Sequence, residues 1–196
     1  MPAKKPVFIS FAGKAPQTDR LYEALESRVR TECSHLRYEF LGDPFEHYST
    51  MRIDDKPKHD YLPTSRTFFR LGLFNEFNET VVKPAFDRNP DFVVVRAYGY
   101  DLYRYAVEYQ DCEKSLKIHK ALIPFTVLGL GLCPPEYMFS LKISPADRVI
   151  MDRYFIEGSG QTKRIIDASL SIEAKVDRVI ALIQSGMQQR KEARVA

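Results

Sequence analysis

With 196 residues, the chain is long enough for one domain with a substantial core. Hydrophobic residues make up 44% and charged residues 28% of it, which is the composition of a soluble globular protein. The 29 basic and 26 acidic residues leave a formal net charge of +3, too small an excess to indicate nucleic acid as a partner, so we expect none. We therefore expect a single domain over residues 1–196.

The cysteines and the N-terminal segment bear on where in the cell the protein is located. Cys33, Cys112 and Cys133 are odd in number and widely spaced, so they suggest neither a disulfide framework nor a zinc site. The apolar stretch before Gly13 is too short for a signal peptide, and no later stretch approaches the roughly twenty apolar residues of a membrane span. These features predict a cytoplasmic protein with no membrane association. The four histidines are scattered without ligand spacing, so we expect no metal bound by histidine.

The first elements along the chain are a strand, a tight loop and a helix. Residues 7–11 form a β-rich apolar run, and a helical spacing of apolar residues follows, starting near residues 17–19. The loop between them carries Gly13 and Lys14. Lys14 is a candidate anion-binding residue because a helix N-terminus follows it; the alternative is a solvated lysine at a turn.

The middle of the chain adds two strands and a helix around a long segment. Residues 38–41 are predicted to form a strand, and residues 42–63, rich in proline and charge, a long surface segment. Helical spacing runs over residues 67–86, and the fully apolar residues 92–95 predict a buried parallel strand.

The rest of the chain continues the alternation and ends in a polar tail over residues 185–196. A helix, a strand, a short helix, a strand and an amphipathic helix are predicted in turn at residues 101–119, 137–143, 146–151, 163–166 and 172–182. This alternation predicts an α/β fold with a central parallel sheet, with residues 7–11, 92–95 and 137–143 as neighbouring core strands and with ligands at the carboxyl ends of the strands.

Five segments occur in the order and approximate spacing of one family. These are GKAPQTDRLYEAL, ETVVKPAF, FVVVRAYGY, PPEYMFSLKISPADR and RIIDASLSIEAKVDRVIALI. The chain resembles the thymidylate kinases over most of its length. The resemblance implies a three-layer P-loop kinase fold with helices on both faces of the sheet. It also implies ATP-dependent transfer of phosphate to a deoxynucleoside monophosphate, with magnesium.

The sequence departs from this family at the groups that carry the chemistry. The loop before Gly13 lacks the first glycine of the G-x-x-x-x-G-K-[ST] pattern, and Ala15 replaces the hydroxyl residue that ligands magnesium. Where the family has Asp-Arg-Tyr at the end of a strand, this chain has Val95-Arg96-Ala97 and keeps only the arginine. The resemblance therefore implies a degenerate P-loop and the loss of a carboxylate on the metal side.

Two further departures concern the acceptor and the lid. The resemblance implies an arginine that binds the acceptor phosphate at about the place where this chain has Phe74. Arg70, one turn earlier, is a possible but shifted substitute. The lid segment is short. The candidate phosphate-binding residues are Gly13, Lys14 and Arg96, the candidate substrate-binding residues are Arg70, Tyr98 and Tyr100, and the candidate lid residues are Arg148 and Arg153.

Several functions remain open at this point. The leading hypothesis is a nucleotide-binding or regulatory pseudokinase; the first alternative is an active nucleoside monophosphate kinase with an altered site, using ATP and Mg²⁺. A module that binds a protein partner or a second copy of itself is the next alternative. The opening VFISFAG with LYEALE also resembles TIR-type domains, which implies cleavage of NAD or self-association.

Overall fold

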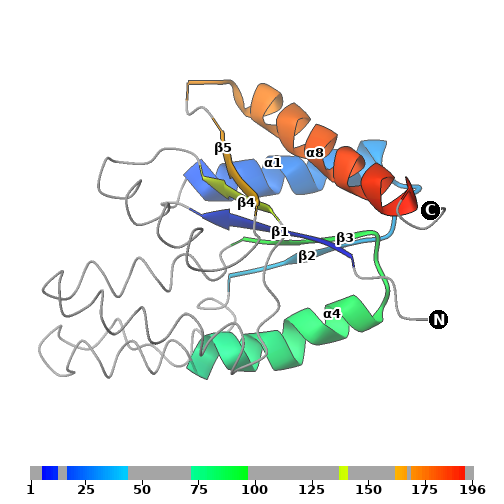
Figure 1. Ribbon diagram of the computed structural model, residues 1–196. Coiled ribbons are helices and arrows are strands. Elements are labelled where there is room, and N and C mark those ends of the chain that lie inside the picture. The colour runs from blue at the N-terminus through cyan, green and yellow to red at the C-terminus, as the bar shows by residue number, and fades with distance from the viewer. Residues whose placement is uncertain are drawn as a thin grey trace, which may run out of the picture.

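The protein is described from a computed structural model, in which residues 6–12, 17–43, 72–96, 137–140, 162–166 and 169–192 are described. Five parallel strands form one sheet in the order β2-β3-β1-β4-β5 (Figure 1). Their bounds are Val7–Ala12 for β1, Tyr38–Leu41 for β2, Phe92–Val95 for β3, Tyr137–Ser140 for β4 and Thr162–Ile165 for β5.

The register places β1 between β3 and β4. Val7 to Ser10 of β1 pair with Phe92 to Val95 of β3, and Ile9 pairs with Tyr137 on the other side. The prediction that residues 7–11, 92–95 and 137–143 form neighbouring parallel strands is confirmed for the residues that the structure describes. Since parallel strands run in one direction, their carboxyl ends share one edge of the sheet.

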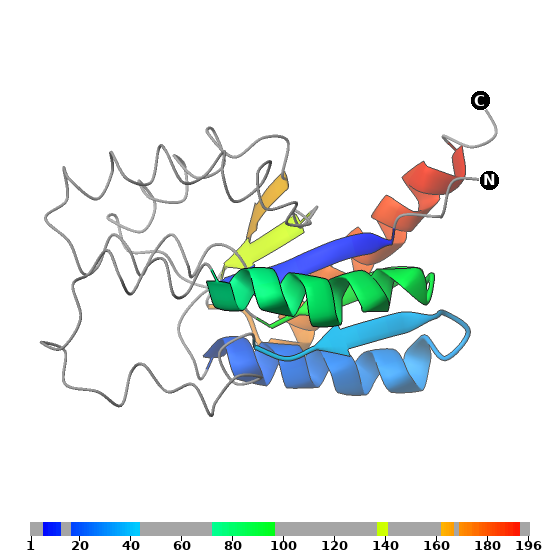
Figure 2. The same ribbon diagram turned by 90° about the horizontal axis from the view of Figure 1, so that it is seen from below.

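Helices cover both faces of this sheet. Helices α1 (Gln17–Glu32) and α8 (Ile172–Glu192) lie side by side on one face, and a helix over residues 72–87 lies on the other (Figures 1 and 2). That second helix contains the π-helical turn η1 (Asn78–Val82) and α4 (Lys83–Asp87). The expected three-layer α/β architecture is confirmed.

The two faces of the sheet build two separate cores because successive side chains of a strand point to opposite faces. On the α1 and α8 side, Val7, Ile9 and Phe11 pack with apolar side chains of both helices. On the other side, Phe8 packs with the helix over residues 72–87, where its ring meets that of Phe86 edge to face at a centroid distance of 5.2 Å. Burial on both faces explains why β3 is an unbroken apolar run and why β1 is apolar except for the buried Ser10.

Helix α1 packs against α8 through a stripe of buried side chains. Leu21, Leu25 and Val29 recur every four residues and are at most 1% exposed, and Val179 of α8 is 0% exposed in the same cluster. At the solvent edge of this contact, Arg28 Nη1 lies 2.8 Å from Asp177 Oδ1. The apolar stripe holds the two helices together, since an exposed ion pair contributes little.

The helix over residues 72–87 contains a wide turn before Pro84, and a residue with positive φ follows its C-terminus. In η1 the Lys83 N–H donates to the Asn78 carbonyl, and this wide turn directly precedes Pro84, which has no N–H for the carbonyl four residues before it. At the C-terminus, Asn89 adopts φ 53° and donates its N–H to the Phe86 carbonyl at 2.8 Å. Pro90 follows, so the chain turns directly into β3.

Most predicted elements in the described residues have the expected bounds, and one is clearly longer. Helix α8 was predicted to end at Leu182 but continues to Glu192, so residues 185–192 of the predicted polar tail are helical. Strand β5 begins one residue earlier than predicted. The predictions for residues 44–63, 67–71, 101–119, 141–143 and 146–151 fall outside the described residues.

In the part of the chain that the structure describes, no helix has both the length and the apolar character needed to cross a bilayer.

Candidate functional site

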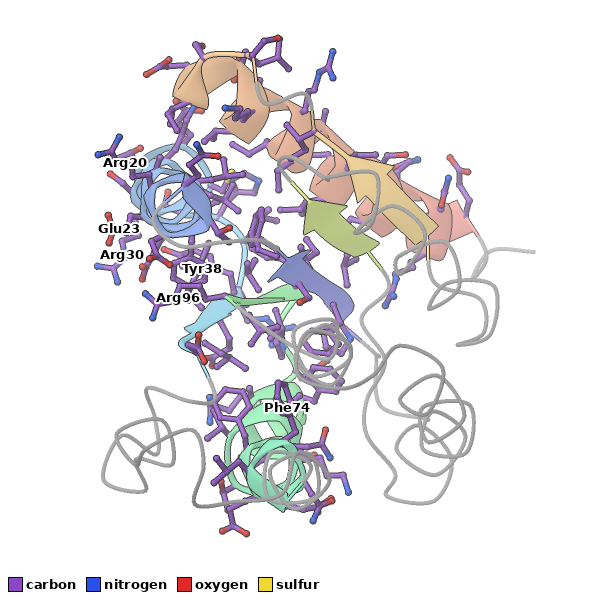
Figure 3. All side chains as sticks on the ribbon, turned by 90° about the vertical axis from the view of Figure 1, so that its left-hand side faces the viewer. Arg20, Glu23, Arg30, Tyr38, Phe74 and Arg96 are labelled. Atoms are coloured by element: carbon purple, nitrogen blue, oxygen red, sulfur yellow. The ribbon has the colours of Figure 1, made fainter. Side chains whose placement is uncertain are left out.

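One of the predicted site residues, Arg96, lies in the described part of the chain. It follows β3 directly and therefore stands at the carboxyl edge of the sheet, which Figure 3 views face on. Its backbone N–H donates to the Leu41 carbonyl at 3.1 Å and so continues the pairing of β3 with β2. The other predicted residues lie outside the described residues: Gly13, Lys14, Arg70, Tyr98, Tyr100, Arg148 and Arg153.

The Arg96 side chain faces the first turn of α1. Its Nε lies 3.5 Å from Asp19 Oδ1, and the two side chains are 16% and 30% exposed. Helix α1 begins at Gln17, with four residues between it and the end of β1 at Ala12, so its N-terminus lies at the same edge of the sheet as Arg96. An arginine and a helix N-terminus, both of which attract anions, are thus brought to one place.

A buried tyrosine connects α1 to this edge. The Tyr22 hydroxyl donates to the Leu41 carbonyl at 2.8 Å, so this one carbonyl accepts from both Tyr22 and Arg96. Burial raises the pKa of Tyr22 far above its ordinary value, and nearby Glu26 raises it further, while Arg96 and Arg30 act in the opposite direction. Tyr22 is therefore a neutral hydrogen-bond donor that fixes α1 against the ends of β2 and β3.

Two positions that the family resemblance marks for polar groups are apolar and buried here. Val95, in the place of the family's aspartate, is 0% exposed and packs in the core on the α4 side of the sheet. Phe74, near the place of the family's arginine, is also 0% exposed in that cluster, and it lies across the sheet from α1 (Figure 3). Neither position offers a ligand for a phosphate or a metal ion.

The described residues contain no group of three or more histidine, cysteine, aspartate or glutamate side chains that could hold a metal ion. Cys33 is a free, buried cysteine at the end of α1, far along the helix from Asp19, and burial raises the pKa of its thiol. At the carboxyl edge, the described residues thus show the Arg96 guanidinium facing Asp19 at the N-terminal turn of α1.

A solved thymidylate kinase matches this architecture over nearly the whole chain. The crystal structure of thymidylate kinase from Ehrlichia chaffeensis superposes with a TM-score of 0.58 at 14% identity, covering 92% of this chain and 100% of that one. The chain has a thymidylate-kinase-like fold. No protein-family model and no curated protein matches the sequence. At 14% identity the likeness concerns the fold, and the chemistry has to be argued from the residues themselves.

In this thymidylate-kinase-like fold, Arg96 was predicted from the sequence as a site residue, whereas Asp19 and Tyr22 were not. Both residues fell within the helical pattern predicted to start near residues 17–19. The position of Asp19 in the first turn was the available signal, because first-turn side chains lie at the end of the helix where ligands bind in such sheets. Its pairing with Arg96, 77 positions later in the chain, required the fold.

Proposed function

We propose that the protein is a nucleotide-binding member of the thymidylate-kinase-like fold whose catalytic loop is degenerate, so that it binds a nucleotide phosphate without transferring it efficiently. The proposal assigns it a binding or regulatory role. The observation that carries it is the position of Arg96 at the carboxyl edge of β3, facing the N-terminal turn of α1. A planar guanidinium beside a helix N-terminus suits a phosphate group.

The loss of transfer follows from the groups that such chemistry needs. Phosphoryl transfer depends on positioning and on neutralising charge with magnesium. Ala15 has no hydroxyl for the metal, and Val95 is buried among apolar side chains where a carboxylate would be needed. Nucleotide binding by Arg96 survives these losses, whereas a metal-dependent reaction does not.

Calorimetric titration of ATP, ADP and dTMP, each with and without magnesium, tests this function. We expect weak binding that changes little with magnesium, because Ala15 and Val95 stand where groups that hold the ion near the phosphates would be needed. Arg96→Ala should weaken nucleotide binding about tenfold or more, as expected for loss of a charged hydrogen-bond donor. Lys14→Ala tests the second predicted phosphate-binding residue in the same way.

Arg88→Ala is the matched control. Arg88 precedes β3 at the opposite edge of the sheet and pairs with Glu39, so it carries the same charge without facing the proposed site. Its loss should leave nucleotide affinity within about twofold of the original value, as expected for a distant surface charge screened by salt. Equal weakening by both changes would mean that only net charge matters.

The assay for magnesium-dependent ADP formation separates the alternatives. Turnover of ATP with any nucleoside monophosphate would establish an active kinase and contradict the degenerate-loop proposal. Absence of binding by every nucleotide would favour a partner-binding role, for which co-purification of a stable partner is the measurement. Cleavage of NAD would favour the TIR-type alternative.

A further inference from the structure

We propose that Asp19 is an internal counter-ion of the anion site, which a bound phosphate has to displace from Arg96. In this view the Asp19 carboxylate lowers the affinity of the site for phosphate, and its removal strengthens binding. The inference rests on the proposed function, because it assumes that Arg96 binds the phosphate. It adds a residue that sets affinity and that acts against the ligand.

The Arg96 side chain is mostly buried. The side chain is only 16% exposed, and a guanidinium with so little contact with water requires a nearby negative charge. In the described part of the chain, the acidic side chain paired with it is Asp19, with Oδ1 at 3.5 Å from Nε. Without a ligand, Asp19 therefore supplies charge that a phosphate would otherwise supply.

Asp19 lies in the first turn of α1. Asp19 is the third residue of the helix, where a carboxylate is favoured by the positive end of the helix dipole. Asp19 thus uses both attractive features of the site, the helix N-terminus and Arg96, and a bound phosphate would compete for both of them. The like charges of a carboxylate and a phosphate at one place repel each other.

The contact between Asp19 and Arg96 is loose. The separation of 3.5 Å exceeds the roughly 2.7–2.9 Å of a strong charge-assisted hydrogen bond. Asp19 is also 30% exposed, so its carboxylate has water to turn toward when a ligand arrives. An ion pair of this kind is displaced at little cost, which suits a counter-ion better than a fixed structural link.

Two ligands that differ only in charge provide the test. At pH 7.5 the phosphate of dTMP carries nearly two negative charges, since its second pKa lies near 6, and its methyl ester carries one. We expect calorimetry to show that Asp19→Asn binds dTMP about fivefold more tightly than the unchanged protein, the most that a partly exposed ion pair contributes. The gain for the methyl ester should be smaller, because repulsion scales with ligand charge.

Glu23→Gln is the matched control, because Glu23 is exposed one turn further along the same helix and its change removes the same charge (Figure 3). This control should shift dTMP affinity less than twofold, as screening predicts for a more distant surface charge. Asp19→Glu keeps the charge and should bind like the unchanged protein. Asp19→Ser, which also suits a helix start, replaces the asparagine variant if that one fails to fold.

Each outcome decides the inference. Tighter binding of dTMP by Asp19→Asn, with a smaller gain for the ester, supports it, including the case in which binding is detected only in the variant. Unchanged or weaker binding by the variant overturns it and leaves the proposed function intact, provided that Arg96→Ala weakens binding as expected above. If neither the unchanged protein nor the variant binds dTMP or ATP, both the inference and the proposed function are wrong.

Discussion

The Leu41 carbonyl shows how a few side chains hold the candidate site together. It accepts from the Tyr22 hydroxyl and from the Arg96 N–H, and so joins α1 to the ends of β2 and β3. The Tyr22 ring also meets Phe40 edge to face at a centroid distance of 5.4 Å. Arg96 is thus fixed at its backbone by the sheet, while its side chain makes only a loose contact with Asp19.

Removing the Tyr22 hydroxyl should weaken this junction moderately. We expect Tyr22→Phe to lower the free energy of unfolding by about 1 kcal/mol at pH 7, since one buried hydrogen bond is lost while Leu41 keeps its bond to Arg96. Urea denaturation measures the change. A loss above about 3 kcal/mol would mean that the ring itself had moved.

The same variant tests the pKa of Tyr22. Burial raises the pKa of Tyr22 in the folded protein above its value of roughly 10 in the unfolded chain, so above about pH 10 the unfolded chain ionises first. The stability advantage over Tyr22→Phe should therefore be fully present below pH 10 and shrink by up to about 1.4 kcal/mol per pH unit above it. Urea titrations of both proteins at pH 8 and 10.5 measure the difference, and an equal advantage at both values would contradict the assignment.

Restoring the family's arginine at Phe74 should fail because that position belongs to the core. Phe74→Arg would place a charge among apolar side chains, and we expect it to lower the free energy of unfolding by more than about 3 kcal/mol. Phe74→Leu, the control, should cost only about 1–2 kcal/mol. Similar stability for the two variants in urea would show that the arginine reaches water.

The helices end through local chemistry that can be tested separately from packing. Asn89 has φ 53°, and its Oδ1 is buried without a hydrogen-bond partner among the described residues. Glycine adopts this conformation without strain, whereas a residue with a Cβ and no polar side chain does not. The turn between the helix over residues 72–87 and β3 therefore depends on residue 89.

We expect Asn89→Gly to leave the free energy of unfolding unchanged or to raise it slightly, and Asn89→Ala to lower it by about 1 kcal/mol. The two variants lose the same amide group, so their difference isolates the backbone conformation. Thermal unfolding of both proteins measures it. Equal melting temperatures would indicate that the turn rearranges around the substitution.

In the described part of the molecule, β1 and β3 place apolar side chains on both faces of the sheet, and Arg96 and Asp19 lie at its carboxyl edge. The end of β3 shows the change from core to edge. Val95 belongs to the core and Arg96 to the edge, one position apart, because the strand stops between them. A catalytic site in this fold needs several groups at that edge together with a closed loop, so single substitutions are poor tests of its loss.

Ala15→Ser should therefore not confer robust kinase activity. The hydroxyl supplies one missing group, while the loop before Gly13 stays short and position 95 stays apolar, and groups that act as a unit are strongly non-additive. The measurement is ADP formation from ATP and dTMP with magnesium, with the unchanged protein as the control. A large gain from this one change would show that the loop is not degenerate.

For the residues that the structure describes, the sequence alone was sufficient for the element types and for the parallel sheet. The runs at residues 38–41 and 92–95 correspond to β2 and β3 without error. Strand β3 is buried on both faces and is therefore an unbroken apolar stretch, whereas β2 is only partly buried and contains Glu39; turn residues on either side mark the ends of both. The start of α8 at residue 172 was also predicted, since a helix start has a local signal. Arg96 was identified because it directly follows such a strand.

Only the tertiary structure decided where α8 ends and what Arg96 meets. The mostly polar stretch after Leu182 carries no apolar stripe strong enough to predict a helix, yet Met187 packs against the core cluster to which α1 and α8 both contribute. The pairing of Arg96 with Asp19, and the shared acceptor at Leu41, join residues far apart in the chain. Such contacts have no local signature, because they arise when the parallel strands bring their carboxyl ends to one edge and α1 is packed against that edge.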